Sequence, residues 1–133
     1  MNEALVASAP PTTPPFTAKE GRAVVKSLQG TYPTIYPVVL RFTSEGWDSI
    51  LDWGETRLAK RKGKKVFLIS INSTLCHAGQ FMVLVHEYAH ALAWPATDKQ
   101  ADAEKFHHSP EWGIAEARLW ALVGDEKPQG RAF

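Results

Sequence analysis

The 133-residue sequence has little cysteine, little net charge and no long apolar run. Its single cysteine, Cys76, cannot form an internal disulfide or supply a four-cysteine metal site, which favours a reducing compartment. A formal net charge of +1 gives no general attraction to nucleic acid or to an anionic membrane. No apolar run approaches the ~20 residues that a membrane-spanning helix needs. We therefore expect a cytoplasmic protein without a membrane partner.

Between two polar ends, the sequence has enough apolar residues to form one domain. Hydrophobic residues make up 44% of the chain, which suffices for a buried core at this length. Residues 1–15 are rich in proline and offer few side chains to bury, so we expect a disordered tail. Residues 125–133 are polar and indicate a flexible C-terminal tail. The prediction is a monomeric domain over residues 16–124.

The first half of this region predicts a helix and a strand. Thr17 and Glu20 have the spacing of a capping box, and apolar residues then recur at helical spacing as far as Gly30. The segment Val38–Phe42 is β-branched and aromatic but follows Pro37, which cannot donate a ladder hydrogen bond. We expect this strand at an edge of a sheet.

A β-hairpin is predicted next. The runs Glu55–Arg61 and Lys65–Asn72 flank Gly63, and the second run is rich in β-branched residues. We expect Val66–Asn72 to form an edge strand that could align an extended peptide by main-chain hydrogen bonds.

Two further helices are predicted in the second half of the chain. Ala78–Trp94 contains no proline, is largely apolar and ends before Pro95, which is typical of a buried helix. Ser109 followed by Pro110 is a strong helix start, because serine caps the helix and proline suits its first position. This last helix should end near Val123, where Gly124 follows.

The segment from His86 to His90 reads H-E-x-x-H and lies inside the predicted buried helix. Residues four apart share one face of a helix, so both imidazoles can reach one zinc ion at ~2.0–2.1 Å. Glu87 lies ~100° round the axis, where it can meet a water on the metal without binding the metal itself. The pattern therefore predicts His86 and His90 as zinc ligands and Glu87 as the general base.

The alternative is a chance match, with two ordinary histidines and a solvated carboxylate. The apolar residues on both sides of the motif argue against it, because they would bury three polar groups together. An unsatisfied buried polar group costs about 1–3 kcal/mol, and a bound cation would satisfy all three.

A catalytic zinc site normally takes a third protein ligand. His77 precedes His86 by more than two helical turns and is better explained as a loop or cap residue. His107 and His108 stand just before the last helix and should point apart, so only one of them should bind. The candidates from the residues alone are His77, His107, His108, Glu111 and Glu116.

The string HEYAHALAW, followed after a polar connection by HSPEWG from His108 to Gly113, resembles the SprT-like family of zinc metallopeptidases. The resemblance implies that His108 is the third ligand, with Ser109 at the family's usual glycine position and Trp112 at its aromatic one. Glu111 then serves the dipole of the last helix, and His107 is exposed or supports the site. The family's layout also implies an α+β fold: a minimal zincin-like domain with a small three-stranded sheet and about three helices.

These features together predict a zinc-dependent endopeptidase that hydrolyses peptide bonds with a Zn²⁺-activated water. Glu87 would take the proton of that water and return it to the leaving amine. One alternative is a non-catalytic, zinc-stabilised module that binds DNA or protein. Another is metal-dependent hydrolysis of a bond other than a peptide bond, which the motif allows.

Other side chains have simpler explanations. The basic stretch from Arg57 to Lys65 could contact DNA, although lysines at a sheet edge are also an ordinary protection against aggregation. Tyr88 is expected in the core, and Cys76 is expected to be an inert thiol. We expect three tryptophans to pack the two metal-site helices together: Trp94, Trp112 and Trp120.

Overall fold

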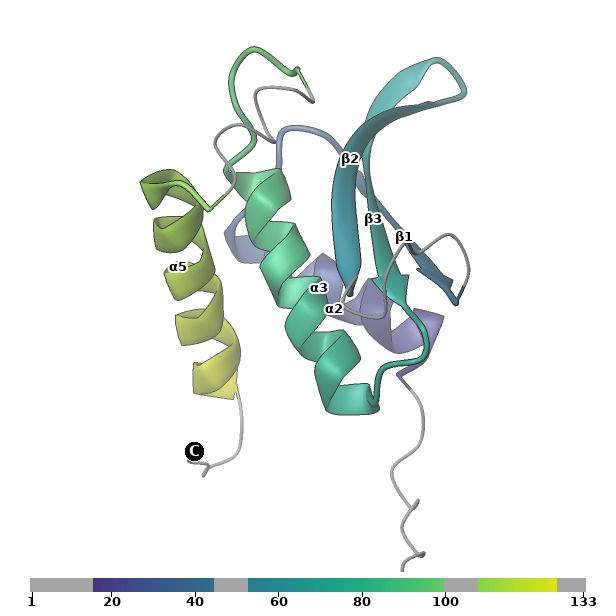
Figure 1. Cartoon of the computed structure of the whole chain (residues 1–133). Coiled ribbons are helices and arrows are strands. Elements are labelled where there is room, and N and C mark those ends of the chain that lie inside the picture. Colours follow the sequence, from purple (N-terminus) through teal and green to yellow (C-terminus); the bar gives the residue numbers. More distant parts are fainter. Residues whose placement is uncertain (1–15, 45–52, 100–107, 127–133) are drawn as a thin grey trace, which may run out of the picture.

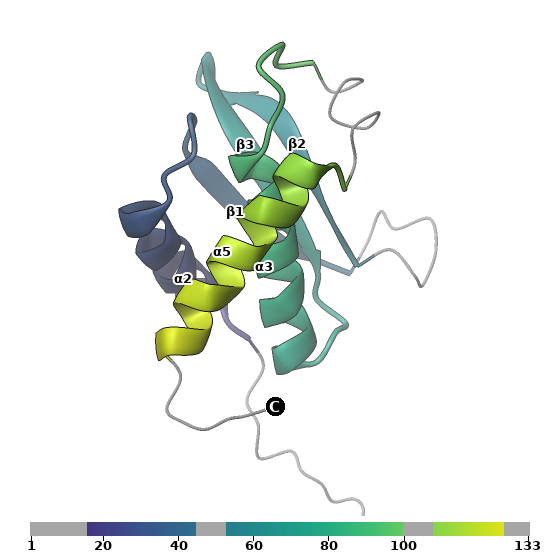
Figure 2. The ribbon, with the colours of Figure 1, turned by 90° about the vertical axis from the view of Figure 1, so that its left-hand side faces the viewer.

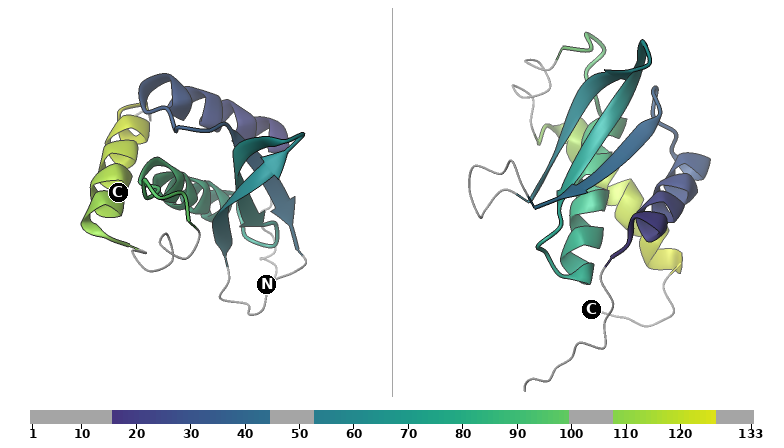
Figure 3. Two further views of the ribbon diagram at one scale, coloured as in Figure 1. Left: turned by 90° about the horizontal axis from the view of Figure 1, so that it is seen from above. Right: turned by 90° about the vertical axis from the view of Figure 1, so that its right-hand side faces the viewer.

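Three helices and a three-stranded sheet make up the part of the chain that the computed structural model describes, residues 16–44, 53–99 and 108–126 (Figure 1). In sequence order, a helix precedes the three strands and two helices follow them. Helix α3 lies between α5 and the sheet (Figure 3, left). The predicted α+β fold, with three helices and three strands in these residues, is confirmed.

Helix α2, Ala18–Thr31, begins with the predicted capping box. The Thr17 hydroxyl accepts a hydrogen bond from the Glu20 backbone N–H, and the Glu20 carboxylate accepts one from the Thr17 N–H, each at 3.0 Å. Val25 and Leu28 are buried, so one face of the helix packs on the core. Helix α2 contacts strand β1 of the sheet.

The sheet has the strand order β1-β3-β2, with β1 at Val38–Thr43, β2 at Gly54–Arg61 and β3 at Lys64–Asn72. Strand β1 pairs parallel with β3, and β2 pairs antiparallel with it. The predicted hairpin is confirmed, and both Lys62 and Gly63 at its turn have left-handed backbones, with φ of 54° and 78°. Two positive φ angles are typical of a type I′ hairpin turn.

Of the two strands expected at an edge of the sheet, one lies there and the other does not. Strand β1 lies at an edge, as predicted, but Val66–Asn72 belongs to the central strand β3, so its prediction as an edge strand is wrong. The physical reason is visible in the sequence VFLISIN, since a nearly continuous apolar run indicates a strand that is covered on both faces. The second edge strand is β2, which lies beside α3.

Helix α3, His77–Leu92, carries the whole H-E-x-x-H segment. The Cys76 thiol caps its start by accepting a hydrogen bond from the Gly79 N–H at 3.4 Å. The helix is flanked on one side by α5 and on the other by β2 and β3, which explains its many buried residues.

Helix α5, Pro110–Glu126, crosses α3 in Figure 2. Ser109 accepts a hydrogen bond from the Trp112 N–H at 3.3 Å, as expected of a cap. The predicted end near Val123 is wrong, because the helix continues through Gly124. Glycine lowers helix stability by about 1 kcal/mol but does not forbid a helical backbone.

The core lies where α2, α3 and α5 meet the inner face of the sheet. Tyr88 is fully buried, as predicted, and its hydroxyl donates to the Tyr32 carbonyl at 2.7 Å. Trp120 packs on Phe81 of α3, but Trp94 follows the helix and packs on Phe67 of β3. The prediction that Trp94 joins the two metal-site helices is therefore wrong.

None of the helices in the described residues is long and apolar enough to cross a membrane.

Candidate metal centre

Two neighbouring histidines of α3 meet a third histidine that is distant from them in the sequence. His86 and His90 lie one turn apart on α3, and His108 stands two residues before α5. One ring nitrogen from each lies within 4.8 Å of those of the other two, close enough for all three to bind one metal ion. The Nε2 atoms of His86 and His108 are 3.2 Å apart. The structure thus brings together the three histidines predicted as metal ligands.

The backbone of His108 is in the left-handed region, with φ of 57°. This conformation is uncommon for a residue other than glycine, and such strain concentrates at functional sites. Ser109 has no positive φ, so a serine meets no backbone conflict at this position. Because Ser109 caps α5, the start of this helix fixes where His108 stands.

Trp112 forms one wall of the histidine cluster. Its ring centroid lies 4.3 Å from that of His108, 5.0 Å from that of His86 and 5.4 Å from that of His90. Its indole N–H also donates to the His86 carbonyl at 3.4 Å. The expected packing of Trp112 between α3 and α5 is confirmed.

Glu87 points to the sheet rather than to α5, and only 7% of it is exposed. The Thr56 hydroxyl of β2 lies 2.7 Å from its Oε1 and 2.9 Å from its carbonyl oxygen. Burial raises the pKa of the Glu87 carboxyl to about 7, and the Thr56 hydrogen bond opposes that rise. A carboxyl with a pKa near neutrality can both accept and donate a proton.

Sequence reasoning missed Thr56, because a threonine in a strand is an ordinary residue until the partner of that strand is known. It also missed Gly54, where a Cβ would lie 2.5 Å from Val83 Cγ1 and 2.9 Å from the Ser70 carbonyl oxygen. Only glycine lets α3 approach β2 this closely. The sequence feature that could have indicated this close approach was the glycine at the start of β2.

The two carboxylates considered as alternative ligands lie outside the three-histidine cluster among the described residues. Glu111 is exposed in the first turn of α5, as expected of a dipole partner. Glu116 lies closer, with its Oε2 3.6 Å from His86 Nδ1. Glu116 therefore lies beside Nδ1 of His86, whereas His108 lies beside Nε2, the other nitrogen of the same ring.

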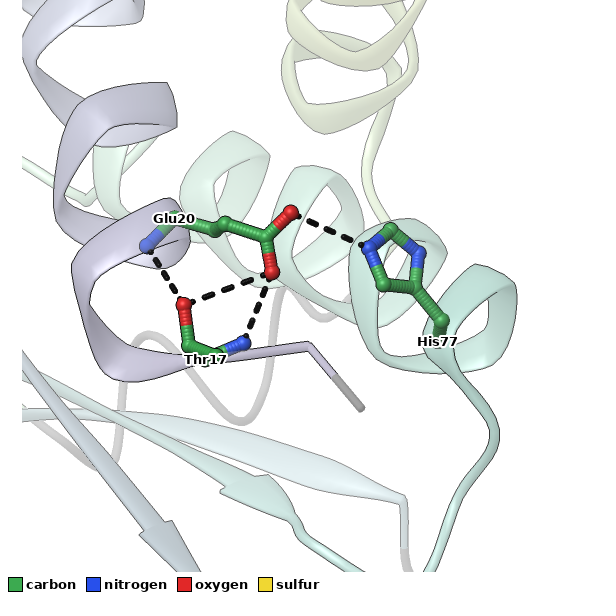
Figure 4. Close-up of polar contacts among 3 residues, drawn as sticks. All are labelled: Thr17, Glu20 and His77. Atoms are coloured by element: carbon green, nitrogen blue, oxygen red, sulfur yellow. Dashed lines mark hydrogen bonds and ion pairs between the residues drawn. The ribbon is translucent and has the colours of Figure 1, made fainter. Parts of the chain in front are cut away.

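Of the two remaining histidine candidates, only His77 lies in the described residues, and it stands apart from this cluster. His77 is the first residue of α3, and its Nε2 lies 3.3 Å from Glu20 Oε2 at the start of α2 (Figure 4). The Thr17 hydrogen bonds and the neighbouring His77 lower the pKa of the Glu20 carboxyl. His77 thus connects two helix starts, while His107 lies outside the described residues.

The basic hairpin that was considered for DNA binding is exposed, and two of its cations have acidic partners. Arg57 pairs with Glu55 at 3.0 Å, and Lys65 pairs with Asp98 at 2.9 Å. Tyr36 also donates to Asp98, and both of its partners lower the pKa of that carboxyl. DNA contact through this hairpin stays a prediction.

Within residues 16–44, 53–99 and 108–126, the histidine cluster, the buried carboxylate and the strand beside them form the candidate functional site. A scan against protein-family models, a search of curated proteins and a search of solved structures found no match to this chain.

Proposed function

We propose that this protein is a zinc-dependent endopeptidase of the zincin type, with His86, His90 and His108 as metal ligands and Glu87 as general base. The observation that carries the proposal is the convergence of three imidazoles beside a buried carboxylate on the same helix. The likeness of HEYAHALAW and HSPEWG to SprT-like peptidases supports it further.

The donor set suits zinc. Three neutral imidazoles and an open fourth position are typical of catalytic zinc sites. Two nitrogens that bind one tetrahedral zinc at ~2.0–2.1 Å are about 3.4 Å apart. The 3.2 Å between Nε2 of His86 and Nε2 of His108 is close to that value. Zinc, when bound, would supply a Lewis acid that polarises a carbonyl and makes a water molecule more acidic.

The chain's own part in hydrolysis is proton transfer. Glu87 takes a proton from the attacking water and delivers it to the leaving amine. Its burial favours the second step, because it raises the pKa of the carboxyl to about 7 in the metal-free chain. Thr56 donates to Oε1, which holds that oxygen toward β2. Oε2 is then the oxygen available to the reacting water.

Strand β2 is the best candidate to bind an extended substrate. Among the described strands it pairs only with β3, so its other edge has no strand partner there. It lies against α3, and its Thr56 contacts Glu87, so a peptide added to this edge would run past the metal centre. This edge takes the role that was expected of Val66–Asn72.

The test is the full chain loaded with zinc and incubated with an unfolded protein, with cleavage followed by mass spectrometry. Glu87→Gln keeps the size of the side chain but removes the base, so it should retain zinc and lose about 10²–10⁴-fold in rate. Glu111→Gln, an exposed carboxylate of α5, is the matched control and should remain active.

Two outcomes would contradict the peptidase proposal. A fully active Glu87→Gln would remove Glu87 from the mechanism. A zinc-loaded wild type that leaves unfolded and DNA-bound proteins intact would favour the zinc-stabilised binding module instead.

A further inference from the structure

We infer that Glu116 is a positioning residue of the metal centre, whose carboxylate holds His86 by Nδ1 so that Nε2 is the nitrogen presented to the metal. The inference rests on the proposed role of His86 as a ligand. It adds a residue from α5 that controls how firmly the ion is held.

The two nitrogens of His86 have different surroundings. Nε2 lies 3.2 Å from His108 Nε2, on the side where the three imidazoles converge. Nδ1 lies 3.6 Å from Glu116 Oε2. A neutral imidazole has one protonated nitrogen and one with a free lone pair, and only the second can bind a metal. A carboxylate beside Nδ1 favours the proton there and leaves the lone pair on Nε2.

The distance of 3.6 Å is within ion-pair range and slightly longer than a hydrogen bond. The carboxylate therefore acts mainly through its charge. Both side chains are about one third exposed, at 34% for His86 and 28% for Glu116, so solvent screens this charge less than on the open surface.

Helix α5 contacts His86 at two points. Trp112 donates to its carbonyl at 3.4 Å, and Glu116, one turn later on the same face of α5, lies beside its ring. Ala115 and Leu119 are buried in the core, which fixes the rotation of α5 about its axis. The rotation that buries these two residues thus also aims the Glu116 carboxylate at His86.

A direct bond from Glu116 to the metal fits the geometry less well. Its carboxylate faces Nδ1, and the metal-binding cluster of the described residues consists of the three histidines alone. Glu116 is therefore better placed to orient a ligand than to act as one.

The experiment measures Zn²⁺ affinity of the full chain by competition with a chromophoric chelator, which requires no peptidase substrate. Glu116→Ala should weaken zinc binding by about ten- to hundredfold, as loss of an outer-shell carboxylate typically does. Glu116→Gln keeps the shape of the side chain but removes its charge, so it should weaken zinc binding nearly as much as Glu116→Ala does. Glu111→Gln, on the same helix but exposed, should bind zinc as wild type does.

A second measurement excludes a merely structural effect. Nitrogen-15 NMR of the metal-free chain reports which nitrogen of His86 carries the proton, and Glu116→Ala should shift that proton away from Nδ1. In the cobalt-substituted protein, the visible spectrum of Glu116→Gln should keep the wild-type ligand number.

Unchanged zinc affinity and an unchanged His86 tautomer in Glu116→Ala would overturn the inference, as would a cobalt spectrum showing one ligand fewer. A wild type without zinc affinity would overturn the metal site as well. If zinc binding depends on Glu116 but the protein cleaves no substrate, the result would support the inference and contradict only the peptidase function.

Discussion

The two sides of α3 provide two different environments for adjacent residues. His86 faces α5, where the imidazoles are partly exposed, whereas Glu87 faces β2, where it is almost completely buried. Consecutive residues of a helix project ~100° apart, so a single step along the chain moves from one environment to the other. Exposure on the α5 side would give an ion access to the histidines. Burial on the β2 side raises the pKa of the Glu87 carboxyl to about 7.

This comparison implies that the proposed metal binding and the proposed proton transfer depend on different parts of the chain. The α5 side supplies His108, Trp112 and Glu116 around the histidine cluster. The sheet side supplies Gly54 and Thr56 around Glu87. Substitutions on the sheet side should therefore leave zinc affinity largely intact, whereas substitutions that remove zinc on the α5 side should also remove the proposed activity.

The largest effect is expected on the α5 side. His108→Ala removes one of three proposed ligands. Its zinc affinity should therefore fall by more than about ten- to hundredfold, which is the loss typical of changes to residues that only support a ligand. His77→Ala is the matched control, because His77 contacts Glu20 and lies outside the cluster. Equilibrium dialysis with metal analysis of both variants checks this prediction, and equal zinc affinity for the two would contradict it.

A smaller effect is expected where α3 approaches β2. Gly54→Ala places a Cβ 2.9 Å from the Ser70 carbonyl oxygen, a backbone atom, so the helix or the strand must move. We expect a loss of about 1–3 kcal/mol in the free energy of unfolding, measured by urea denaturation. The peptidase rate should fall as well, because the same movement displaces Glu87.

Gly30→Ala in α2 is the control for this experiment, since a Cβ added at Gly30 would meet nothing within 4 Å beyond its own stretch of helix. It should stabilise the protein by about 0.5–1 kcal/mol, because alanine restricts the unfolded chain more than glycine does. Two variants of equal stability would show that the close approach at Gly54 is unimportant.

The smallest effect is expected from the Thr56 hydroxyl. Thr56→Val keeps the shape of the side chain and removes the hydrogen bond to Glu87, which is worth about 0.5–1.5 kcal/mol and hence up to about tenfold in kcat. Zinc affinity and KM should stay unchanged, because Thr56 lies on the sheet side. Thr56→Ser retains the hydroxyl and should restore most of the rate; an equally slow serine variant would exclude the hydrogen bond as the cause.

The local features were predictable from sequence because each depends on neighbouring residues. The capping box at Thr17 and the cap at Ser109 follow from hydrogen bonds within one turn. The hairpin at Gly63 follows from the need for positive φ. The facing pair His86 and His90 follows from the period of the helix.

The errors arose where the answer depended on distant contacts. Strand β3 is central because β1 and β2 both pair with it. Its apolar run is typical of a covered strand but does not say which strands pair with it. Trp94 packs on Phe67, a partner that no local pattern indicates. Helix α5 continues through Gly124 because a glycine permits a helix end without requiring one.

Helical periodicity in the sequence was enough to place two histidines and a glutamate on one helix. Packing between distant elements set the rest: His108 joins the pair because α5 packs on α3, and Glu87 is buried because Gly54 lets β2 approach. The physical reason is that a local pattern fixes the direction of a side chain along its own helix. Burial, pKa and the identity of distant neighbours are set by which elements pack against that helix.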